Sequence, residues 1–373
     1  MSIKFIHNVT TDYRVPFFRQ VSDEHDVEFL FTHTDSPAGL EKDEYEVLGR
    51  DPSFVLQLAK EVADDEHDVV VNCEPGGLTS VLWTVFIFVM AKVSGKKHVL
   101  WSERYEPPKW SVRFAIMHFI YKIIIPRSDA CFVPGLQHRE YMLKLGASPE
   151  SVFLVPNVSN LTQVDRADDD PDSIRQQLGI ENKHVVLYAG RIDRAKGLQY
   201  LIPAFDEVRR HRDDVALVIV GSGYYESKIK ELYEEHETED TYFVGWVDNE
   251  ELPNYYMMAD IFVHPSIQLI SRRGGSIGDA YGLVFNEAAH FGLPVIGTDA
   301  AGASHDVVRN GENGFVVPQR DSEALSEKIE ALLSDDEMRE AMGRRSKEIV
   351  ENSRSYRHMF EGFDHSIEYV QNQ

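Results

Sequence analysis

Short apolar segments alternate with helix-like segments along most of this chain, and that alternation restricts the fold more than any other feature of the sequence. In the first half, the segments that read as strands are Ile3–Ile6, Val27–Phe31, Val69–Asn72, Val99–Trp101, Ala130–Val133 and Val152–Val155. Helix-like stretches such as Pro16–Ser22 lie between several of them. Strands that alternate with helices in this way predict a parallel sheet covered by helices on both faces.

The second half repeats the alternation. Its predicted strands are Val185–Tyr188, Ala216–Val220, Thr241–Val244, Ile261–Val263, Val295–Thr298 and Phe315–Val317, and its predicted helices include Leu198–Arg210, Ser227–Glu235 and most of residues 322–369. Residues 161–174 are polar and acidic and contain a proline, so we predict a linker there that includes the acidic triplet Asp168–Asp170. The 373 residues therefore predict an α/β fold. Its two Rossmann-like, doubly wound parallel-sheet domains, residues 1–160 and 175–350, would face a central cleft.

The charge of the chain bears on its partners. The formal net charge of −24 disfavours nucleic acid, because phosphate backbones are bound by Lys and Arg. This negative charge is typical of proteins from a high-salt cytoplasm and equally of ordinary acidic proteins. Residues 92–127 depart from this trend, since aromatic residues there are interleaved with two acids and eight basic residues, namely Lys92, Lys96, Lys97, Arg104, Lys109, Arg113, Lys122 and Arg127. This segment predicts either contact with an anionic membrane surface or, over Phe114–Ile125, a core helix.

Other sequence features indicate the cellular compartment. The two cysteines, Cys73 and Cys131, predict buried, reduced thiols. No signal pattern is present at the N-terminus, and the apolar run Val81–Val93 is too short to span a bilayer. These features predict a cytoplasmic protein, peripheral on the inner face of the membrane if residues 92–127 bind lipid. No group of His, Cys and Asp residues has metal-ligand spacing, so we predict neither metal nor cofactor.

Two loops that follow predicted strands suggest a phosphate-containing ligand. Gly190 and Arg191 follow the strand Val185–Tyr188, and Lys196 stands five residues after Arg191 at the start of a helix. Two cations beside free helix N–H groups suit a diphosphate, although a solvated pair of charges would give the same pattern. The second loop, Gly221-Ser222-Gly223, lacks the third glycine of a dinucleotide-binding loop, and this disfavours a nicotinamide-dependent oxidoreductase.

A pair of carboxylates follows in the stretch GDAYGLVFNEAAHFGLPVIG. Asp279 and Glu287 are eight residues apart and flank Tyr281, Gly282 and Leu283, where a helix is predicted to begin. Taken alone, such a pair suggests an acid and a base.

The order of these motifs resembles the C-terminal domain of the family 4 retaining glycosyltransferases, or glycosyl transferases group 1, which have the GT-B fold. The matching elements are Gly190-Arg191 with Lys196, Gly221-Ser222-Gly223, Gly245, Ala259-Asp260 to Pro265-Ser266, Asp279 to Glu287, Gly292 to Val295 and Gly311 to Val316. The match is good over residues 185–320. In the first half, Pro156-Asn157 matches best, and residues 351–373 resemble the helix that crosses back to the N-terminal domain.

The resemblance implies transfer of a sugar from a nucleotide-diphosphate donor to a glycan or lipid-linked acceptor in surface glycan, glycolipid or glycoprotein assembly. It implies that Arg191 and Lys196 hold the diphosphate and stabilise the leaving group, that Asp279 binds hydroxyls of the donor sugar and that Glu287 binds those of the ribose. The backbone at Tyr281, Gly282 and Leu283 would face the donor, and Gly190, Gly221 and Gly223 would let it approach. No metal is implied. Another GT-B enzyme, such as a nucleotide-sugar epimerase, and a non-catalytic nucleotide-sugar-binding protein remain alternatives.

The chain departs from the family pattern at several points. Asp279 stands where the family usually has Glu, and residues 267–278 form a longer loop than expected. Arg272 and Arg273 in this loop would meet a charged sugar or an acceptor phosphate, unless the loop is a solvated insertion. Further candidates for acceptor or sugar contacts, chosen because they follow predicted strands, are Asn8, Tyr13, Arg14, Gly76, Gly77 and Glu103. For Glu103 the alternative is an ion pair with Arg104 or a lysine.

Overall fold

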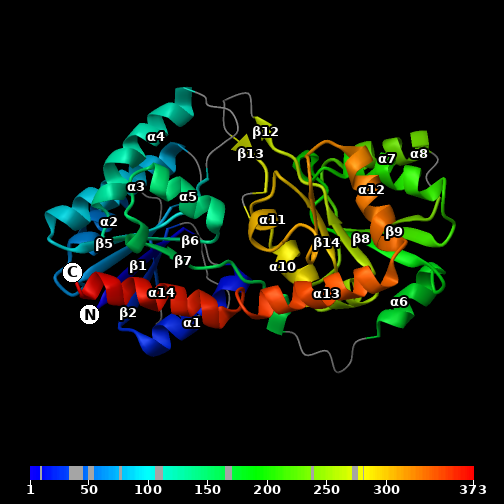
Figure 1. The fold of residues 1–373 in the computed structure, drawn as a ribbon. Coiled ribbons are helices and arrows are strands. Elements are labelled where there is room, and N and C mark those ends of the chain that lie inside the picture. Colours follow the sequence, from blue (N-terminus) through cyan, green and yellow to red (C-terminus); the bar gives the residue numbers. More distant parts are fainter. Residues whose placement is uncertain are drawn as a thin grey trace. The chain divides into compact units, whose positions relative to one another are not determined.

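The computed structural model describes residues 1–8, 11–32, 45–48, 54–74, 78–105, 112–163, 170–236, 239–270, 276–279 and 281–373. These residues form two compact units (Figure 1). The first comprises Met1–Val158 together with Ser355–Gln373, and the second comprises Ser159–Arg354. Each unit is a parallel sheet covered by helices, as the alternation of apolar segments predicts.

The sheet of the first unit has seven parallel strands in the order β3-β2-β1-β4-β5-β6-β7. The strands are β1 (Ile3–His7), β2 (Val27–Phe31), β3 (Tyr45–Val47), β4 (Val69–Cys73), β5 (Lys97–Trp101), β6 (Ala130–Val133) and β7 (Val152–Leu154). The six strands predicted in this half are confirmed. The sequence did not reveal β3, because this three-residue strand lies at the edge of the sheet and none of its residues is buried.

Helices cover both faces of this sheet. They are α1 (Val15–Glu24), α2 (Phe54–Ala63), α3 (Leu78–Val93), α4 (Val112–Ile124), α5 (Leu136–Lys144) and α14 (Tyr356–Gln371). The last helix of the chain, α14, packs against α1, β6 and β7 (Figure 1). Its Phe363 is fully buried against Phe5, Phe17 and Phe132. The C-terminal segment is therefore part of the core of the first unit.

The second unit contains six parallel strands in the order β10-β9-β8-β11-β14-β15. They are β8 (His184–Ala189), β9 (Val215–Val220), β10 (Thr241–Gly245), β11 (Ile261–His264), β14 (Val295–Thr298) and β15 (Gly314–Val317), and a small antiparallel pair, β12 (Leu269–Ile270) and β13 (Ser276–Ile277), lies apart from the sheet. All six strands predicted in this half are confirmed. The order reverses between β8 and β11, and ligands of open parallel sheets bind beyond the carboxyl ends of strands at such a reversal.

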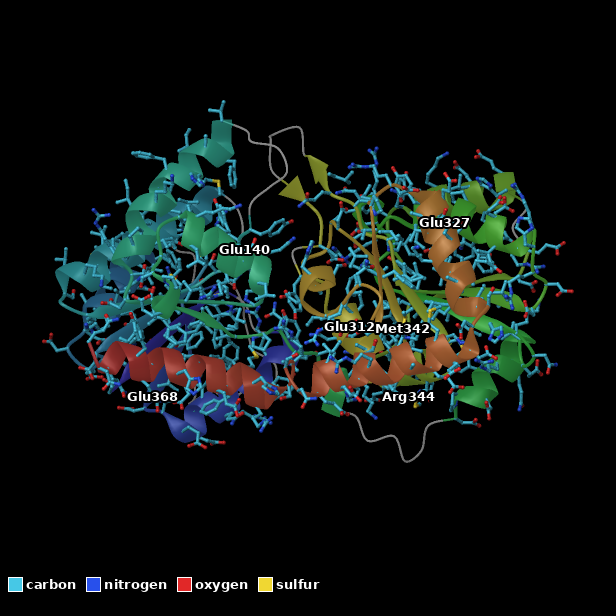
Figure 2. All side chains as sticks on the ribbon, viewed as in Figure 1. Glu140, Glu312, Glu327, Met342, Arg344 and Glu368 are labelled. Atoms are coloured by element: carbon cyan, nitrogen blue, oxygen red, sulfur yellow. The ribbon has the colours of Figure 1, made fainter. Side chains whose placement is uncertain are left out.

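The helices of the second unit are α6 (Pro171–Leu178), α7 (Leu198–Arg209), α8 (Glu226–His236), α9 (Leu252–Met257), α10 (Leu283–His290), α11 (Gly302–Asp306), α12 (Ser322–Leu333) and α13 (Asp336–Glu351). Apolar residues of α7, α8 and α12 form one core cluster with the sheet, and those of α10 and α11 belong to another. Charged residues such as Glu327 on α12 and Arg344 on α13 lie on the exposed sides of the helices (Figure 2).

The predicted linker, residues 161–174, is wrong at both ends, because its first and last residues lie in helices of the second unit. Leu161 is buried in the core of this unit, within the 3-10 helix η4 (Asn160–Gln163). Asp170 caps α6 by accepting a hydrogen bond from the backbone N–H of Ser173, and Pro171 is the first helical residue. An Asp-Pro pair is a helix-start signal, but here the adjacent acids Asp168 and Asp169 obscure it.

The prediction of buried, reduced cysteines is confirmed. Cys73 and Cys131 are both unpaired and buried, and burial raises the pKa of each thiol to about 12. Within the described part of the chain, no helix is both long and apolar enough to cross a bilayer.

Candidate active site

The site begins in the loop that follows β8. Gly190 directly follows the strand, and the loop runs through the 3-10 helix η5 (Arg194–Lys196) to Gly197. Gly197 has a φ of +79°, and a Cβ at this position would lie 1.8 Å from the carbonyl oxygen of Pro265. The backbone N–H of Ile267 donates to the carbonyl of Ala195 at 2.7 Å. Glycine therefore lets the loop after β8 contact the residues that follow β11, where the strand order reverses.

Four side chains converge at this point. Oδ2 of Asp279 accepts hydrogen bonds from Lys196 Nζ at 2.6 Å, His264 Nε2 at 2.8 Å and Ser266 Oγ at 3.0 Å. His264 is the last residue of β11, and Ser266 follows it by two residues. Oδ1 of Asp279 has no hydrogen-bonding partner within the described ranges. One oxygen of this carboxylate is therefore fixed, and the other is left to bind a ligand.

The cluster has a defined charge state. Burial opposes ionisation of Asp279, but the hydrogen bond from His264 and the charge of Lys196 outweigh it and hold the pKa of this carboxyl below its usual value. Burial lowers the pKa of His264, and the hydrogen bond to Asp279 offsets this only in part. Asp279 is thus ionised and His264 is neutral around pH 7.

Arg191 and Lys196, the two cations predicted to bind a diphosphate, lie in different environments. Lys196 is paired with Asp279, and its side chain is 14% exposed. The side chain of Arg191 is 81% exposed and lies 3.2 Å from Asp193, whose carboxylate also accepts from the backbone N–H of Ala195. Arg191 is thus presented to solvent, whereas Lys196 belongs to a preformed cluster.

Glu287 is buried in α10 and is held on both sides. Ser159 Oγ donates to Oε1 and the Tyr256 hydroxyl donates to Oε2, each at 2.7 Å. Burial raises the pKa of Glu287. A carboxylate oxygen can accept two hydrogen bonds, so each oxygen of Glu287 has capacity for one more. Its predicted contact with ribose stays a prediction, and no sequence motif indicates the hydrogen bonds from Ser159 and Tyr256.

Backbone donors lie beside Asp279. Gly282 precedes α10 with a φ of +98°, and no side chain caps this helix. The first N–H groups of the helix, from Leu283 onward, therefore point out of its N-terminus without a capping side chain. The N–H of Ala303 donates to the carbonyl of Tyr281 at 2.8 Å and holds the preceding turn. An uncapped helix start next to Lys196 suits an anionic group.

Two of the predicted donor-binding glycines have another role in the structure. A Cβ on Gly221 would lie 1.9 Å from the carbonyl oxygen of Gly190, and one on Gly223 would lie 2.3 Å from that of Ile192. These glycines let the loops after β8 and β9 pack backbone to backbone. Their approach to a nucleotide remains a prediction.

In the first unit, several candidate residues gather at the carboxyl ends of strands. Arg14 is buried, lies over the Trp101 ring and donates to Oε1 of Glu103 at 2.5 Å, and Asn157 Nδ2 donates to the same oxygen at 3.1 Å. The alternative pairing of Glu103 with Arg104 was wrong, because Glu103 is bound to Arg14 and Arg104 is bound to the buried Glu74.

The remaining candidates for acceptor or sugar contacts are less informative. Asn8 directly follows β1, and the carbonyl of Tyr13 accepts from the Tyr356 hydroxyl at 2.5 Å. Gly76, Gly77, Arg272 and Arg273 lie outside the described residues. No structural observation therefore bears on the predicted contacts of these four residues.

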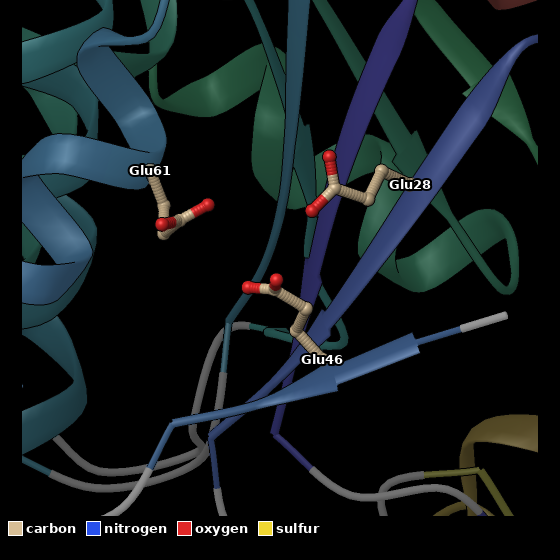
Figure 3. Close-up of side chains that lie close together, drawn as sticks. All are labelled: Glu28, Glu46 and Glu61. Carbon is tan, nitrogen blue, oxygen red and sulfur yellow. The ribbon is translucent and has the colours of Figure 1, made fainter. Parts of the chain in front are cut away.

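One group of carboxylates within the described ranges has the spacing of a metal site. Glu28, Glu46 and Glu61 turn their carboxylates toward one another (Figure 3). However, Lys4 Nζ lies 2.7 Å from Glu28 and 2.8 Å from Glu61. Since this ammonium group already forms ion pairs with two of the three acids, the cluster does not call for a metal ion.

Sequence reasoning missed His264, Ser266, Tyr256 and Ser159 as members of the site. A signal existed for the first two, because the stretch Val263-His264-Pro265-Ser266 ends a strand next to β8. Ser159 and Tyr256 carry no comparable signal, since they reach Glu287 only through the tertiary fold.

Comparison with known proteins relates the chain to one family of enzymes. Residues 170–349 match the family model of the glycosyl transferases group 1. The chain is 28% identical over 264 residues to a GDP-mannose-dependent alpha-(1-6)-phosphatidylinositol monomannoside mannosyltransferase of Mycobacterium tuberculosis, with 70% of this chain and 66% of that protein covered. It is 27% identical over 262 residues to a lipopolysaccharide 1,2-N-acetylglucosaminetransferase of Salmonella typhimurium, covering 67% and 65%. The aligned part is thus slightly less than two-thirds of each relative.

Solved structures extend the likeness to both units. HepE from Anabaena, solved in complex with UDP, has a TM-score of 0.79 and 17% identity, covering 99% of this chain and 100% of that one. Sucrose-phosphate synthase from Thermosynechococcus elongatus has a TM-score of 0.73 and 20% identity, covering 100% and 99%. At these identities the likeness establishes the fold. Residues 170–349 thus match the group 1 glycosyl transferases, and the two Rossmann-like units of the chain have the GT-B fold.

Proposed function

We propose that this protein is a retaining glycosyltransferase that moves a hexose from a nucleoside-diphosphate sugar to a glycan or lipid-linked acceptor. The observation that carries the proposal is the convergence of Lys196, His264 and Ser266 on one oxygen of Asp279, beside the uncapped start of α10 and at the reversal of strand order. Such a place suits a ligand with an anionic part and a hydroxyl-bearing part.

Each group in the cluster has a role in this reaction. Lys196 Nζ has three N–H donors, so it can bind Asp279 and a phosphate oxygen together. Its charge and the N–H groups of α10 stabilise the negative charge that develops on the departing diphosphate. Oδ1 of Asp279 accepts from sugar hydroxyls. Oδ2 already accepts three hydrogen bonds, so the Asp279 carboxylate is better suited to bind sugar hydroxyls than to act as a nucleophile.

A ligand screen tests the proposal. We expect UDP-glucose, UDP-N-acetylglucosamine or GDP-mannose to raise the thermal unfolding temperature of the purified chain, because a ligand that binds only the folded state stabilises it. Radiolabelled donor should then transfer its sugar to a lipid or glycan extract. If no donor raises the unfolding temperature, the proposal is wrong. Conversion of a donor without any acceptor would identify an epimerase, and binding without turnover a non-catalytic protein.

We further propose that the enzyme works at a membrane surface, which it contacts through α3 and α4. Four large apolar residues of α4 are exposed at helical spacing, namely Val112, Ile116, Phe119 and Ile123, at 81%, 54%, 66% and 46%. On α3, Leu82, Val89 and Val93 are exposed by 66%, 47% and 78%. Such apolar stripes are unusual on helices that face only water. We call the four α4 residues the α4 stripe.

The charges near the α4 stripe support an anionic lipid surface as its partner. Neither α3 nor α4 contains an acidic residue, although the whole chain has 62. Lys122 and Arg127 are exposed beside the stripe. Four of the eight basic residues predicted to bind lipid are paired with acids instead, namely Lys92 and Lys97 with Asp129, Lys96 with Asp64 and Arg104 with Glu74. Apolar insertion therefore contributes more than charge.

Vesicle sedimentation tests this surface. We expect the protein to sediment with phosphatidylglycerol-containing vesicles. The double change Ile116→Ser and Phe119→Ser should weaken this binding at least about tenfold, because each side chain loses roughly 1.5–3 kcal/mol of apolar burial. Leu56→Ser on α2 is the matched control, since Leu56 is 75% exposed but lies outside both helices.

Three results of this experiment would contradict membrane contact through the α4 stripe. Equal sedimentation of the double variant and the wild type would rule out the α4 stripe as the contact, as would an equal loss in Leu56→Ser. Concentration-dependent dimerisation that the double change abolishes, without any vesicle binding, would assign the stripe to a second copy of the chain.

A further inference from the structure

His264 is held in a fixed orientation at the end of β11. Its ring is fully buried and stacks on the Tyr188 ring, with centroids 5.5 Å apart and planes inclined by 7°. The ring of Phe285 meets it edge-on at 5.4 Å and 76°. These contacts from β8 and α10 leave the imidazole little freedom to rotate, so Nε2 points at Asp279 whether or not a ligand is bound.

The partners of the two ring nitrogens determine the tautomer. An ionised Asp279 is only an acceptor, so the proton of the 2.8 Å hydrogen bond must be on Nε2. Nδ1 is buried and has no hydrogen-bond partner within the described ranges, so protonating it would leave a buried N–H unpaired. Burial also lowers the pKa of this imidazole. His264 is therefore a neutral donor and not an acid or base near pH 7.

We propose that His264 is a positioning residue that, with Ser266 and Lys196, anchors Oδ2 of Asp279 so that Oδ1 is presented to two hydroxyl groups of the donor sugar. This inference rests on the proposed function. Oδ1 can accept two hydrogen bonds and carries negative charge, so it selects hydroxyl donors and repels phosphate oxygens. The same carboxylate thereby separates the sugar end of a donor from its diphosphate end, which faces Lys196 and α10.

The test compares binding of two sugar nucleotides, UDP-glucose and GDP-mannose, with binding of UDP and GDP. Calorimetry on His264→Leu should show an affinity about tenfold or more weaker for the sugar nucleotide that the wild type binds. The affinity for the corresponding nucleoside diphosphate should fall by less than about twofold. The reason is that a hydrogen bond to a charged group is lost only at the sugar end of the donor. His264→Gln should restore most of the affinity, since its amide nitrogen lies about as far along the side chain as Nε2 and also donates.

A pH profile supplies a readout that loss of packing alone would not move. The hydrogen bond from His264 lowers the pKa of Asp279, so its removal raises that pKa. We expect the Asp279 carboxyl, followed by NMR, to protonate at higher pH in His264→Leu than in the wild type or His264→Gln. Phe285→Leu is the packing control, because Phe285 contacts the same ring but donates nothing to the carboxylate.

The outcomes separate the two proposals. A wild-type protein that binds neither these four ligands nor UDP-N-acetylglucosamine overturns the proposed function and this inference with it. When the wild type binds normally, three results overturn the inference alone. They are full affinity of His264→Leu for the sugar nucleotide, failure of His264→Gln to restore that affinity, or an equal shift of the Asp279 titration in Phe285→Leu.

Discussion

Replacing Lys196 by methionine is expected to lower kcat/KM for sugar transfer by about a hundredfold to a thousandfold, the cost typical of removing one preorganised stabiliser of developing charge. Methionine keeps most of the apolar length of the side chain but supplies no charge to the diphosphate. Steady-state kinetics with the donor identified by the ligand screen measure the loss. Lys228→Met on α8 is the matched control, since Lys228 also forms an ion pair, with Glu231 at 2.7 Å, but lies on the surface.

The same change should also affect stability, for a reason that can be separated from catalysis. Without Lys196, Asp279 keeps two neutral donors but loses its cation while its side chain remains only 12% exposed. Leaving a largely buried charge without its partner costs about 3–5 kcal/mol. Adding Asp279→Asn removes that charge, so the double variant should regain much of the stability but none of the activity.

The double variant therefore distinguishes two explanations. Recovery of activity together with stability would mean that Lys196 acts only by supporting the fold, and the proposed role in leaving-group stabilisation would be wrong.

Replacing Gly197 by alanine is expected to cost more than about 3 kcal/mol of unfolding free energy, because a backbone clash cannot be relieved by a change of rotamer. The added Cβ would lie 1.8 Å from the carbonyl oxygen of Pro265. Relief requires the loop after β8 to separate from the residues after β11, and that separation would displace Lys196 from Asp279. Urea unfolding followed by far-UV circular dichroism measures the stability, and transfer assays measure the activity.

Gly311→Ala provides the control for backbone strain alone. Gly311 has a φ of +83°, close to the +79° of Gly197, but nothing lies within 4 Å of a Cβ built there. This control should cost only about 1–2 kcal/mol, the strain of a left-handed residue with a side chain, and should leave activity unchanged. If both variants lost equal stability, close approach to Pro265 would not be the reason for glycine at position 197.

Much of the fold could be predicted because the alternation of apolar segments is a local property. Strands such as Ala130–Val133 and Val215–Val220 are buried on both faces and read as continuous apolar runs. The edge strand Tyr45–Val47 buries too little to leave such a run, and the helix start at Asp170 and Pro171 was masked by neighbouring acids. An element can be predicted when its buried residues form an apolar pattern, and elements at the edges of sheets and units bury the fewest residues.

The site was predictable in part. Lys196 and Asp279 were selected from separate motifs, and the structure brings them to 2.6 Å. Spacing could not show that they form an ion pair, since they are 83 residues apart in the chain. Similarly, Gly221 and Gly223 were recognised as sites of close approach, but sequence could not tell that the approaching group is the backbone of the neighbouring loop.

By itself, the sequence determined the two-fold repetition of strand and helix, the parallel sheets and the set of residues from which a site could be built, because these depend on local apolar patterns and motif order. Tertiary structure alone decided that His264 and Ser266 hold Asp279, that Ser159 and Tyr256 hold Glu287 and that Arg14 and Asn157 hold Glu103. The physical reason is that a carboxylate's free oxygens, charge state and orientation are set by donors that reach it across the fold, and those donors leave no pattern near it in the chain.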